Sequence, residues 1–155
     1  MHPTVTRVAE ILRAAGATGE PVLLADSART AAEAAAALGC DVGAIASSLV
    51  FMADGEPLLV MTSGAHRVDT ELVAGLLGVG KVRRADADTV RTATGYAIGG
   101  VAPVGHPAPL RTLVDVSLAD YDVVWAAAGH SHAVFPTSYE ELVRLTSGTP
   151  ALVAG

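Results

Sequence analysis

The chain has 155 residues, of which 51% are hydrophobic and 17% are charged. This length and composition predict one compact domain over residues 1–155 with a sizeable core. The formal net charge of −6 argues against a protein that clamps a long stretch of nucleic acid, and we expect no DNA partner. Apolar runs fall short of the roughly 20 residues that cross a membrane, and the N-terminal segment lacks a signal-type hydrophobic block. We therefore expect a cytoplasmic protein with no membrane partner, and the single cysteine, Cys40, excludes an internal disulfide.

The N-terminal part of the chain predicts a helix, a strand and a second helix. Apolar residues at helical spacing indicate a first helix that Gly16 closes, and the run PVLLA is typical of a short strand. Thr30 and Glu33 have the capping-box spacing at the start of an alanine-rich helix, which Gly39 ends.

The middle of the chain predicts a β-hairpin and two further helices. The apolar runs SLVFMA and PLLVMT flank a turn that contains Asp54-Gly55, which is a strong hairpin signal. Asp69 is placed to cap the next helix, and either Asp86 or Asp88 is placed to cap the one after it.

The C-terminal part predicts strands at TLVDV, VVWAAA and HAVF, followed by a last helix capped by Ser138 with Glu141. Helices scattered among strands and a hairpin indicate an α+β domain. We expect a curved mixed sheet or a barrel with helices packed outside.

Charge is distributed unevenly along the chain. Positions 64–111 hold six Lys or Arg residues against four Asp or Glu residues, whereas the remainder is strongly acidic. A short basic stretch suits contact with a short anionic end of a partner. A set of solvated surface arginines is the alternative, and the pattern alone leaves both open.

The segment GYAIGGVAPVGH, over positions 95–106, combines four glycines with apolar residues. An idle surface loop would more often consist of Asn, Asp, Ser and Lys, which are readily solvated. Glycine allows a backbone to approach another group closely with its N–H groups available. The segment therefore predicts close approach either to a ligand or to another element of the fold.

Several familiar motifs are absent. The glycine spacing does not match the G-x-G-x-x-G dinucleotide fingerprint, no Lys-Ser/Thr pair closes a P-loop, and no G-x-S-x-G elbow is present. His130 and His132 could bind a metal with His66 or His106 as a third ligand, but no acidic or cysteine ligand lies at a supporting spacing. Structural histidines are the favoured interpretation, and we expect no metal and no cofactor.

Five segments together resemble the YbaK family, also called the prolyl-tRNA-synthetase-associated domain. They are ALGCDVGAIASSLVF, SGAHRVD, ADADTVRTATGYAIGGVAPVGH, TLVDVSL and VWAAAGHSHAVF, and they cover most of the chain. Gly99-x-x-x-Pro103 is similar to the G-x-x-x-P loop of the family. The resemblance implies an editing domain that hydrolyses the ester of a mischarged aminoacyl-tRNA in trans.

This resemblance implies roles for the glycine loop. Backbone N–H groups at Gly99 and Gly100 would cradle the carbonyl oxygen as negative charge develops, and Pro103 would stiffen the loop. The terminal ribose hydroxyl of the tRNA would assist, so no catalytic triad is expected. Further substrate-binding candidates are the walls Leu49, Phe51 and Val101 together with His130 and the preceding Gly129.

The segment AIASSLVF departs from the family pattern. The family usually carries lysine where this chain has Ser47, which Ser48 follows. We expect both serines to contact substrate. Two functions remain open: a trans-acting deacylase for a tRNA carrying a small amino acid, and a non-catalytic YbaK-like module that binds tRNA or an aminoacyl-tRNA synthetase. The expected partner in either case is the acceptor end of a tRNA.

Overall fold

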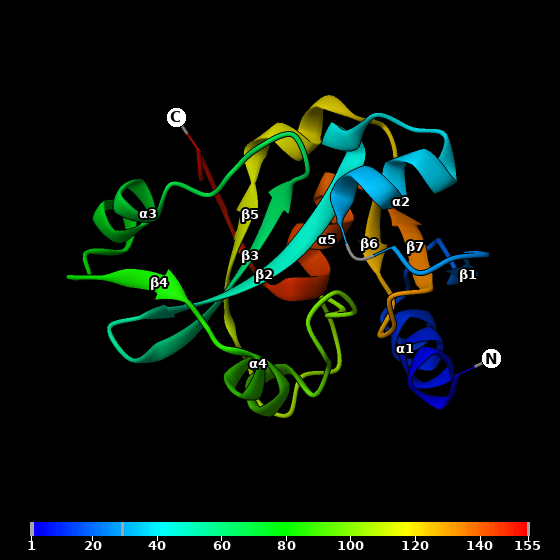
Figure 1. The fold of residues 1–155 in the computed structure, drawn as a ribbon, viewed down its shortest axis with the longest axis horizontal. Coiled ribbons are helices and arrows are strands. Elements are labelled where there is room, and N and C mark those ends of the chain that lie inside the picture. The colour runs from blue at the N-terminus through cyan, green and yellow to red at the C-terminus, as the bar shows by residue number, and fades with distance from the viewer. Residues whose placement is uncertain (1, 29, 155) are drawn as a thin grey trace.

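The computed structural model describes residues 2–28 and 30–154 and shows one mixed sheet with helices on both faces (Figure 1). The helices are α1 (Pro3–Ala14), α2 (Ala31–Leu38), α3 (Thr70–Leu77), α4 (Ala87–Thr94) and α5 (Tyr139–Thr146), and short 3-10 helices lie at η1 (Val42–Ala44) and η2 (Val116–Asp120). The strands are β1 (Val22–Leu23), β2 (Ile45–Ala53), β3 (Glu56–Ser63), β4 (Val82–Arg84), β5 (Arg111–Asp115), β6 (Val124–Ala127), β7 (Ala133–Thr137) and β8 (Thr149–Ala151). The predicted α+β class is confirmed. None of the described helices is long and apolar enough to cross a membrane.

The sheet is mixed and open. Its strands run in the order β1-β7-β6-β2-β3-β5-β8, and β4 pairs with β2 outside this path. β2 pairs antiparallel with β3 and parallel with β6, while β5 is parallel to both β3 and β8. Barrel closure needs a continuous ladder of strands, and the end strands β1 and β8 do not pair with each other in the described chain. Of the two predicted architectures, the curved mixed sheet is therefore the one adopted.

Helices α2 to α5 begin, and the β2–β3 hairpin turns, at the residues that the sequence predicted. Helices α2 to α5 each begin with a side-chain oxygen that accepts a backbone N–H of the first turn, and these caps are Thr30, Asp69, Asp86 and Ser138. Asp86, and not Asp88, therefore caps α4. Asp54 and Gly55 in the hairpin both have positive φ, 49° and 86°, as a type I′ turn requires.

Two strands escaped the sequence analysis. β4 lies inside the basic stretch, where two exposed arginines follow a single buried valine, so the charge pattern concealed its pairing with β2. β8 contains Pro150, which lies shortly after the last predicted helix and gave no strand signal, because proline is rare inside a sheet. Its pairing with β5 at the end of the sheet is compatible with proline because an edge strand can spare one N–H donor.

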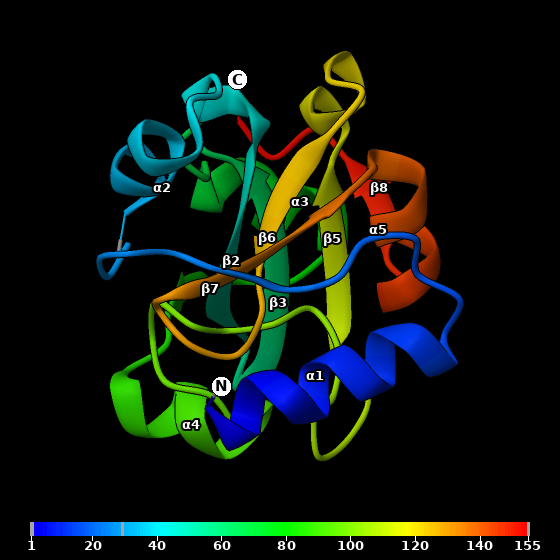
Figure 2. The same cartoon turned by 90° about the vertical axis from the view of Figure 1, so that its right-hand side faces the viewer.

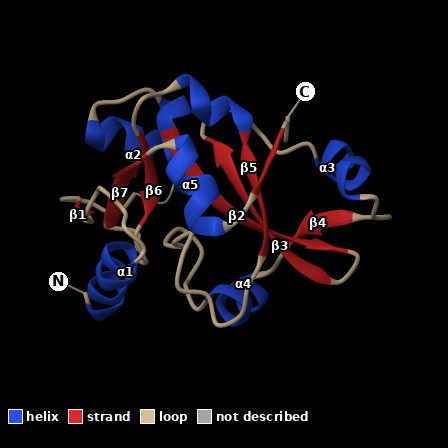
Figure 3. Cartoon of the chain, turned by 180° about the vertical axis from the view of Figure 1, so that it is seen from behind, coloured by secondary structure: helices blue, strands red, loops and turns tan. Residues whose placement is uncertain are grey.

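Helices cover the two faces of the sheet with separate apolar clusters (Figures 2 and 3). Val8 of α1 and Leu142 of α5 belong to the largest cluster, together with Val90 of α4. On the opposite face, Val73 of α3 and Ala34 of α2 belong to two smaller clusters. β2 contributes residues to all three clusters, so it lies at the centre of the core.

Candidate active site

β2 lies at the centre of the sheet, and along one of its two edges the pairing with neighbouring strands is interrupted. Its other edge pairs with β3 over positions 46–53. The interrupted edge pairs with β6 only at 45–46 and with β4 only at 51–53. No strand in the described chain therefore covers positions 47–50 on this edge.

The open edge carries backbone groups of Ser48. The carbonyl of Val50 lies on this edge, where it accepts a 3.1 Å hydrogen bond from the N–H of Ala85. Backbone groups alternate between the two edges of a strand, so the N–H and C=O of Ser48 face the same opening. A ligand that enters the opening meets an unpaired segment of strand.

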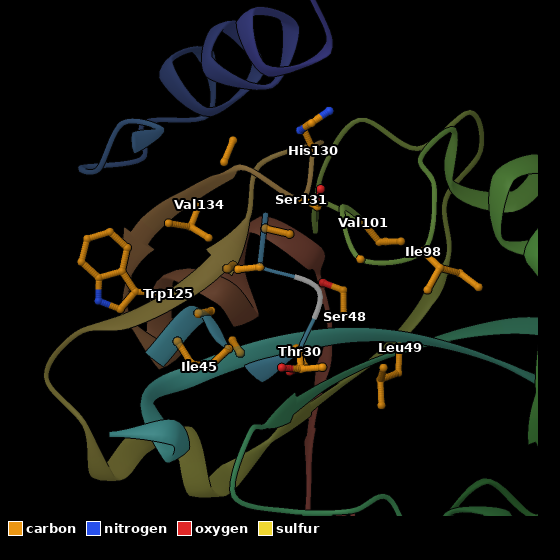
Figure 4. Close-up of a pocket in the computed structure, with 18 of the residues that line it drawn as sticks. Thr30, Ile45, Ser48, Leu49, Ile98, Val101, Trp125, His130, Ser131 and Val134 are labelled. Atoms are coloured by element: carbon orange, nitrogen blue, oxygen red, sulfur yellow. The ribbon is translucent and has the colours of Figure 1, made fainter. Parts of the chain in front are cut away.

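A cavity of about 190 Å³ lies at this opening (Figure 4). Its walls come from β2, β4, β6, β7, the segment before α2 and the glycine loop, and most of its lining side chains are apolar. The lining residues that carry the argument are Thr30, Ser47, Ser48, Leu49, Arg84, Ile98, Gly99, Val101, Trp125 and His130. Arg84 is the one Lys, Arg, Asp or Glu among the described lining residues.

The glycine loop forms one wall through a tight turn. Gly99 has φ of 91°, a left-handed value that suits glycine, and the N–H of Gly100 donates to the carbonyl of Ala97 at 3.0 Å. The N–H of Gly100 is therefore already bonded, which corrects our expectation that it faces the substrate. Among the described residues, the N–H groups of Gly99 and Val101 have no protein acceptor.

Hydrogen bonds brace the far part of the loop. The hydroxyl of Tyr96, a buried side chain, donates to the carbonyl of Val104 at 2.6 Å, and a guanidinium nitrogen of Arg7 donates to Gly105 at 2.7 Å. Burial raises the pKa of the Tyr96 phenol, so it remains a donor. His106 Nε2 lies 2.8 Å from the carbonyl of Ala102. The loop is thus held in place before any ligand binds.

The two serines of β2 face opposite sides of the sheet. Ser48 shares a face with Ala46 and Val50, which belong to the cluster of α1 and α5, and its hydroxyl donates to the sulfur of Met61 at 3.2 Å. Ser47 lies on the other face with Leu49. The cavity reaches both serines because it opens at the edge of the strand.

Four predicted site residues lie outside the cavity lining: Gly100, whose N–H is already bonded to Ala97, and the three described next. Phe51 is buried in the cluster under α3, on the face of β2 opposite the glycine loop. Pro103 lines a second cavity of about 510 Å³ between α1 and α5. Gly129 has φ of 99°, and a Cβ there would lie 2.9 Å from Thr4 and 3.1 Å from Val8, so this glycine allows close packing against α1.

His130 lies at the rim, and Figure 4 shows its ring directed toward α1. Its ring centroid is 4.8 Å from that of His2 and 5.2 Å from that of His132, and its Nδ1 accepts the N–H of His132. Desolvation, followed by repulsion from the two neighbouring histidines, lowers the pKa of His130. The lowered pKa favours the neutral ring, in which Nδ1 accepts this hydrogen bond and Nε2 carries the proton.

Of the histidines that we considered as metal ligands, His66 and His106 bond to groups other than the neighbouring pair His130 and His132. His66 Nδ1 is 3.0 Å from the buried carboxylate of Asp115, and His106 bonds to the backbone of its own loop. Within the described residues, no three His, Cys, Asp or Glu side chains gather at a distance that could hold a metal ion.

Sequence reasoning missed Arg84 and Trp125 as lining residues. Trp125 lies in a run interpreted only as a buried strand, and Arg84 lies in the overlooked strand β4. The sequence does not indicate that Arg84 and Trp125 line the same cavity. They come together because β4 and β6 pair with β2 at opposite ends of its unpaired segment.

Comparison with known proteins places these features in a family. Residues 25–145 match the model of the aminoacyl-tRNA editing domain. The uncharacterized protein YwhH of Bacillus subtilis is 30% identical over 117 residues, which cover 75% of this chain and 74% of that protein. The proline–tRNA ligase of Nitratidesulfovibrio vulgaris (strain DP4) is 31% identical over 98 residues, which cover 63% of this chain but 17% of the ligase.

The same fold occurs in a solved structure described as a candidate trans-editing enzyme for prolyl tRNA synthetase. It has a TM-score of 0.93 and 40% identity to this protein, and the match covers 100% of this chain and 99% of that chain. The matched family segment includes the interrupted strand β2, the glycine loop and Trp125. The chain therefore belongs to the aminoacyl-tRNA editing domain family, as its resemblance to YbaK proteins predicted.

Proposed function

We propose that the protein is a trans-acting deacylase that hydrolyses the ester of a mischarged tRNA carrying a small amino acid. The observation that carries this proposal is the cavity at the gap in β2, which the glycine loop closes on one side. An ester that enters along the open edge meets backbone N–H groups on a braced loop. Membership of the editing family supports this reaction.

Hydrolysis adds water across the ester. The water oxygen attacks the carbonyl carbon, the bond from that carbon to the ribose oxygen breaks, and the ribose oxygen takes a proton. Preorganised N–H donors stabilise the negative charge that develops on the carbonyl oxygen. We assign this role to the N–H groups of Gly99 and Val101. The described lining contains no carboxylate, so we expect the terminal ribose hydroxyl to assist the water.

The size of the cavity supports a small amino acid. Pockets that enclose drug-sized ligands measure about 300–1,000 Å³, whereas this cavity has about 190 Å³. Leu49, Ile98 and Val101 line it with branched apolar side chains (Figure 4). A side chain of one or two heavy atoms fits this space better than a large one.

The tRNA contact is expected at the acceptor end. Trp125 lines the cavity, and an indole face is a stacking platform for a nucleic acid base. We assign it to the terminal adenine. The solved relative described as a candidate trans-editing enzyme for prolyl tRNA synthetase supports a role after mischarging, with a synthetase as a further partner.

A panel of mischarged tRNAs tests the proposal. Purified protein is incubated with alanyl, cysteinyl, seryl and threonyl esters of a tRNA and with a phenylalanyl ester as the bulky case, and release of the amino acid is measured under single-turnover conditions. We expect hydrolysis of at least one small ester and none of a bulky one. Gly99→Ala, purified identically, reports any contaminating deacylase, because alanine is strained at a φ of 91°.

Failure to hydrolyse any ester while an uncharged tRNA still binds would support the alternative, a non-catalytic module. The replacement of the expected lysine by Ser47 is the observation that keeps this alternative in view. Trp125 is the single tryptophan of the chain, so its fluorescence reports binding independently of hydrolysis.

A further inference from the structure

Arg84 is the one Lys or Arg among the described residues that line the cavity. It lies on β4, directly opposite Phe51 of β2, and its guanidinium carbon is 5.5 Å from the centroid of the Phe51 ring. A cation over an aromatic face is attracted by the negative potential of the ring. The strand pairing and the ring together hold the guanidinium beside the opening in β2.

Arg84 is exposed, and it forms no ion pair with any described carboxylate. Its donors are therefore available to a ligand. The neighbouring Arg83 is exposed as well, but successive side chains of a strand point to opposite faces. Arg83 is not part of the cavity lining, so the two arginines form a matched pair that differs in orientation.

The position of Arg84 on the sheet defines one end of the cavity. Cross-strand partners share a face, so Arg84 lies on the same face as Phe51, Leu49 and Ser47. The glycine loop lies on the other face, with Ala46 and Val50. A ligand in the cavity therefore has an end near N–H donors of the loop and another near a fixed positive charge.

The end of an aminoacyl-tRNA offers one kind of anion that the Arg84 guanidinium can bind. The amino acid carboxyl is esterified and carries no charge, and the α-ammonium group would be repelled by a guanidinium. The phosphodiester on the 5′ side of the terminal adenosine is the nearest anion. Arginine suits it because its planar fork donates two parallel hydrogen bonds to phosphate oxygens.

We propose that Arg84 binds the phosphodiester on the 5′ side of the terminal adenosine and thereby directs the ester toward the glycine loop. This inference rests on the proposed function for the identity of the ligand. Arg84 is a positioning residue here, since it does not touch the reacting ester.

Two small probes differ by the phosphodiester and the cytidine attached to it, and the arginine variants then assign the difference to the charge of Arg84. The dinucleotide CpA contains the phosphodiester, whereas adenosine lacks it and keeps the same base and ribose. Binding is measured through Trp125 fluorescence for the wild type, Arg84→Ala, Arg84→Lys and the control Arg83→Ala. We expect the wild type to prefer CpA over adenosine by about tenfold, as one charge-assisted contact allows.

Arg84→Ala should lose the preference for CpA while its affinity for adenosine stays the same. Arg84→Lys should retain part of the preference for CpA, because the ammonium keeps the positive charge but cannot donate two parallel hydrogen bonds. Arg83→Ala should behave as the wild type. With a CCA-ended RNA hairpin, Arg84→Ala should also lower the salt slope of log affinity by about 0.7. Thermal unfolding confirms that the exposed substitution leaves the fold intact.

The outcomes separate this inference from the proposed function. If Arg84→Ala still prefers CpA as the wild type does, the inference is overturned, whether or not the ester panel is hydrolysed. If the preference disappears but no ester is hydrolysed, the inference stands and the deacylase proposal fails. For an active protein, Arg84→Ala should raise KM for the charged tRNA more than it lowers kcat, because phosphate binding acts before the ester reacts.

Discussion

The backbone of His130 lies directly against Gly100. A Cβ atom added at Gly100 would be 3.0 Å from both the Cα and the N of His130, closer than ordinary van der Waals contact. The glycine loop and the β6–β7 turn, which form two walls of the cavity, thus lie against each other with backbone next to backbone at Gly100. The glycine at position 100 serves this packing, and its N–H serves the turn to Ala97.

Gly100→Ala should displace the loop from the β6–β7 turn. Overpacking of this kind costs about 1–3 kcal/mol of unfolding free energy. Misplacement of the loop by a fraction of an ångström should lower deacylation by tenfold to about 10²-fold. Single-turnover rates and urea unfolding measure the two effects.

Gly75→Ala is the matched control for this change. Gly75 lies in α3, away from the cavity, and a Cβ there meets nothing within 4 Å. Alanine should raise the unfolding free energy by about 0.5–1 kcal/mol without changing the deacylation rate. Equal rates for Gly100→Ala and the wild type would contradict the assigned packing role.

Tyr96→Phe should loosen the glycine loop. The substitution removes the 2.6 Å hydrogen bond to Val104 and leaves a buried carbonyl without this donor, at a cost of about 1–3 kcal/mol. We expect lower unfolding free energy together with lower kcat. Tyr139→Phe is the control, because the Tyr139 hydroxyl makes no hydrogen bond in the described structure and its loss should change neither quantity. A Tyr96→Phe protein with wild-type stability would show that this bond does not brace the loop.

Ser47→Lys tests whether the cavity has been rebuilt around a hydroxyl. Ser47 shares a face with Arg84, so an added ammonium would bring a second positive charge and extra volume into a cavity of about 190 Å³. We expect no gain in single-turnover deacylation. Thr92→Lys, at an exposed position of α4, controls for the added surface charge. A gain of about tenfold, or 1.4 kcal/mol of barrier, in Ser47→Lys alone would indicate a decayed site that the lysine restores.

Asp115 should make the fold sensitive to acid. Burial by itself raises the pKa of this carboxyl, but the N–H groups of Ser117 and Ser63 and the contact with His66 outweigh it, so the pKa lies below its ordinary value. A lowered folded-state pKa contributes stability above the unfolded value of about 3.9, and this is lost as pH falls through the folded value.

Urea unfolding between pH 7 and pH 3 measures this contribution. Asp115→Asn should be less stable than the wild type at pH 7. It lacks the carboxylate charge that strengthens the 3.0 Å contacts of Asp115 with the N–H of Ser63 and with Nδ1 of His66. Its stability should decline less than that of the wild type below about pH 3.9. Parallel profiles for the two proteins would exclude Asp115 as a source of the acid sensitivity.

Uncharged tRNA should bind with a shallow dependence on salt. The net charge of −6 and the limited basic stretch allow contact with few phosphates, and each neutralised phosphate contributes about 0.7–0.9 to the slope. Titrations at several salt concentrations measure this slope. A slope that corresponds to six or more phosphates would show that the contact extends well beyond the acceptor end.

The sequence by itself determined the elements that short-range interactions control. Thr30, Asp69 and Ser138 cap helices because each side chain bonds to an N–H two or three residues away, and Asp54-Gly55 turns the hairpin through its own positive φ values. The sequence also predicted the family, because the segments typical of the family occur in the same order along this chain.

Only the tertiary structure decided which groups meet in the cavity. The gap in β2 exists because β6 and β4, which are distant in sequence, pair with its two ends and leave the middle open. The same pairing brings Arg84 into the lining and places Phe51 on the buried side. Such contacts depend on the register between strands, which neighbouring residues in the chain do not encode, and a change of one position in register would exchange the two faces of a strand.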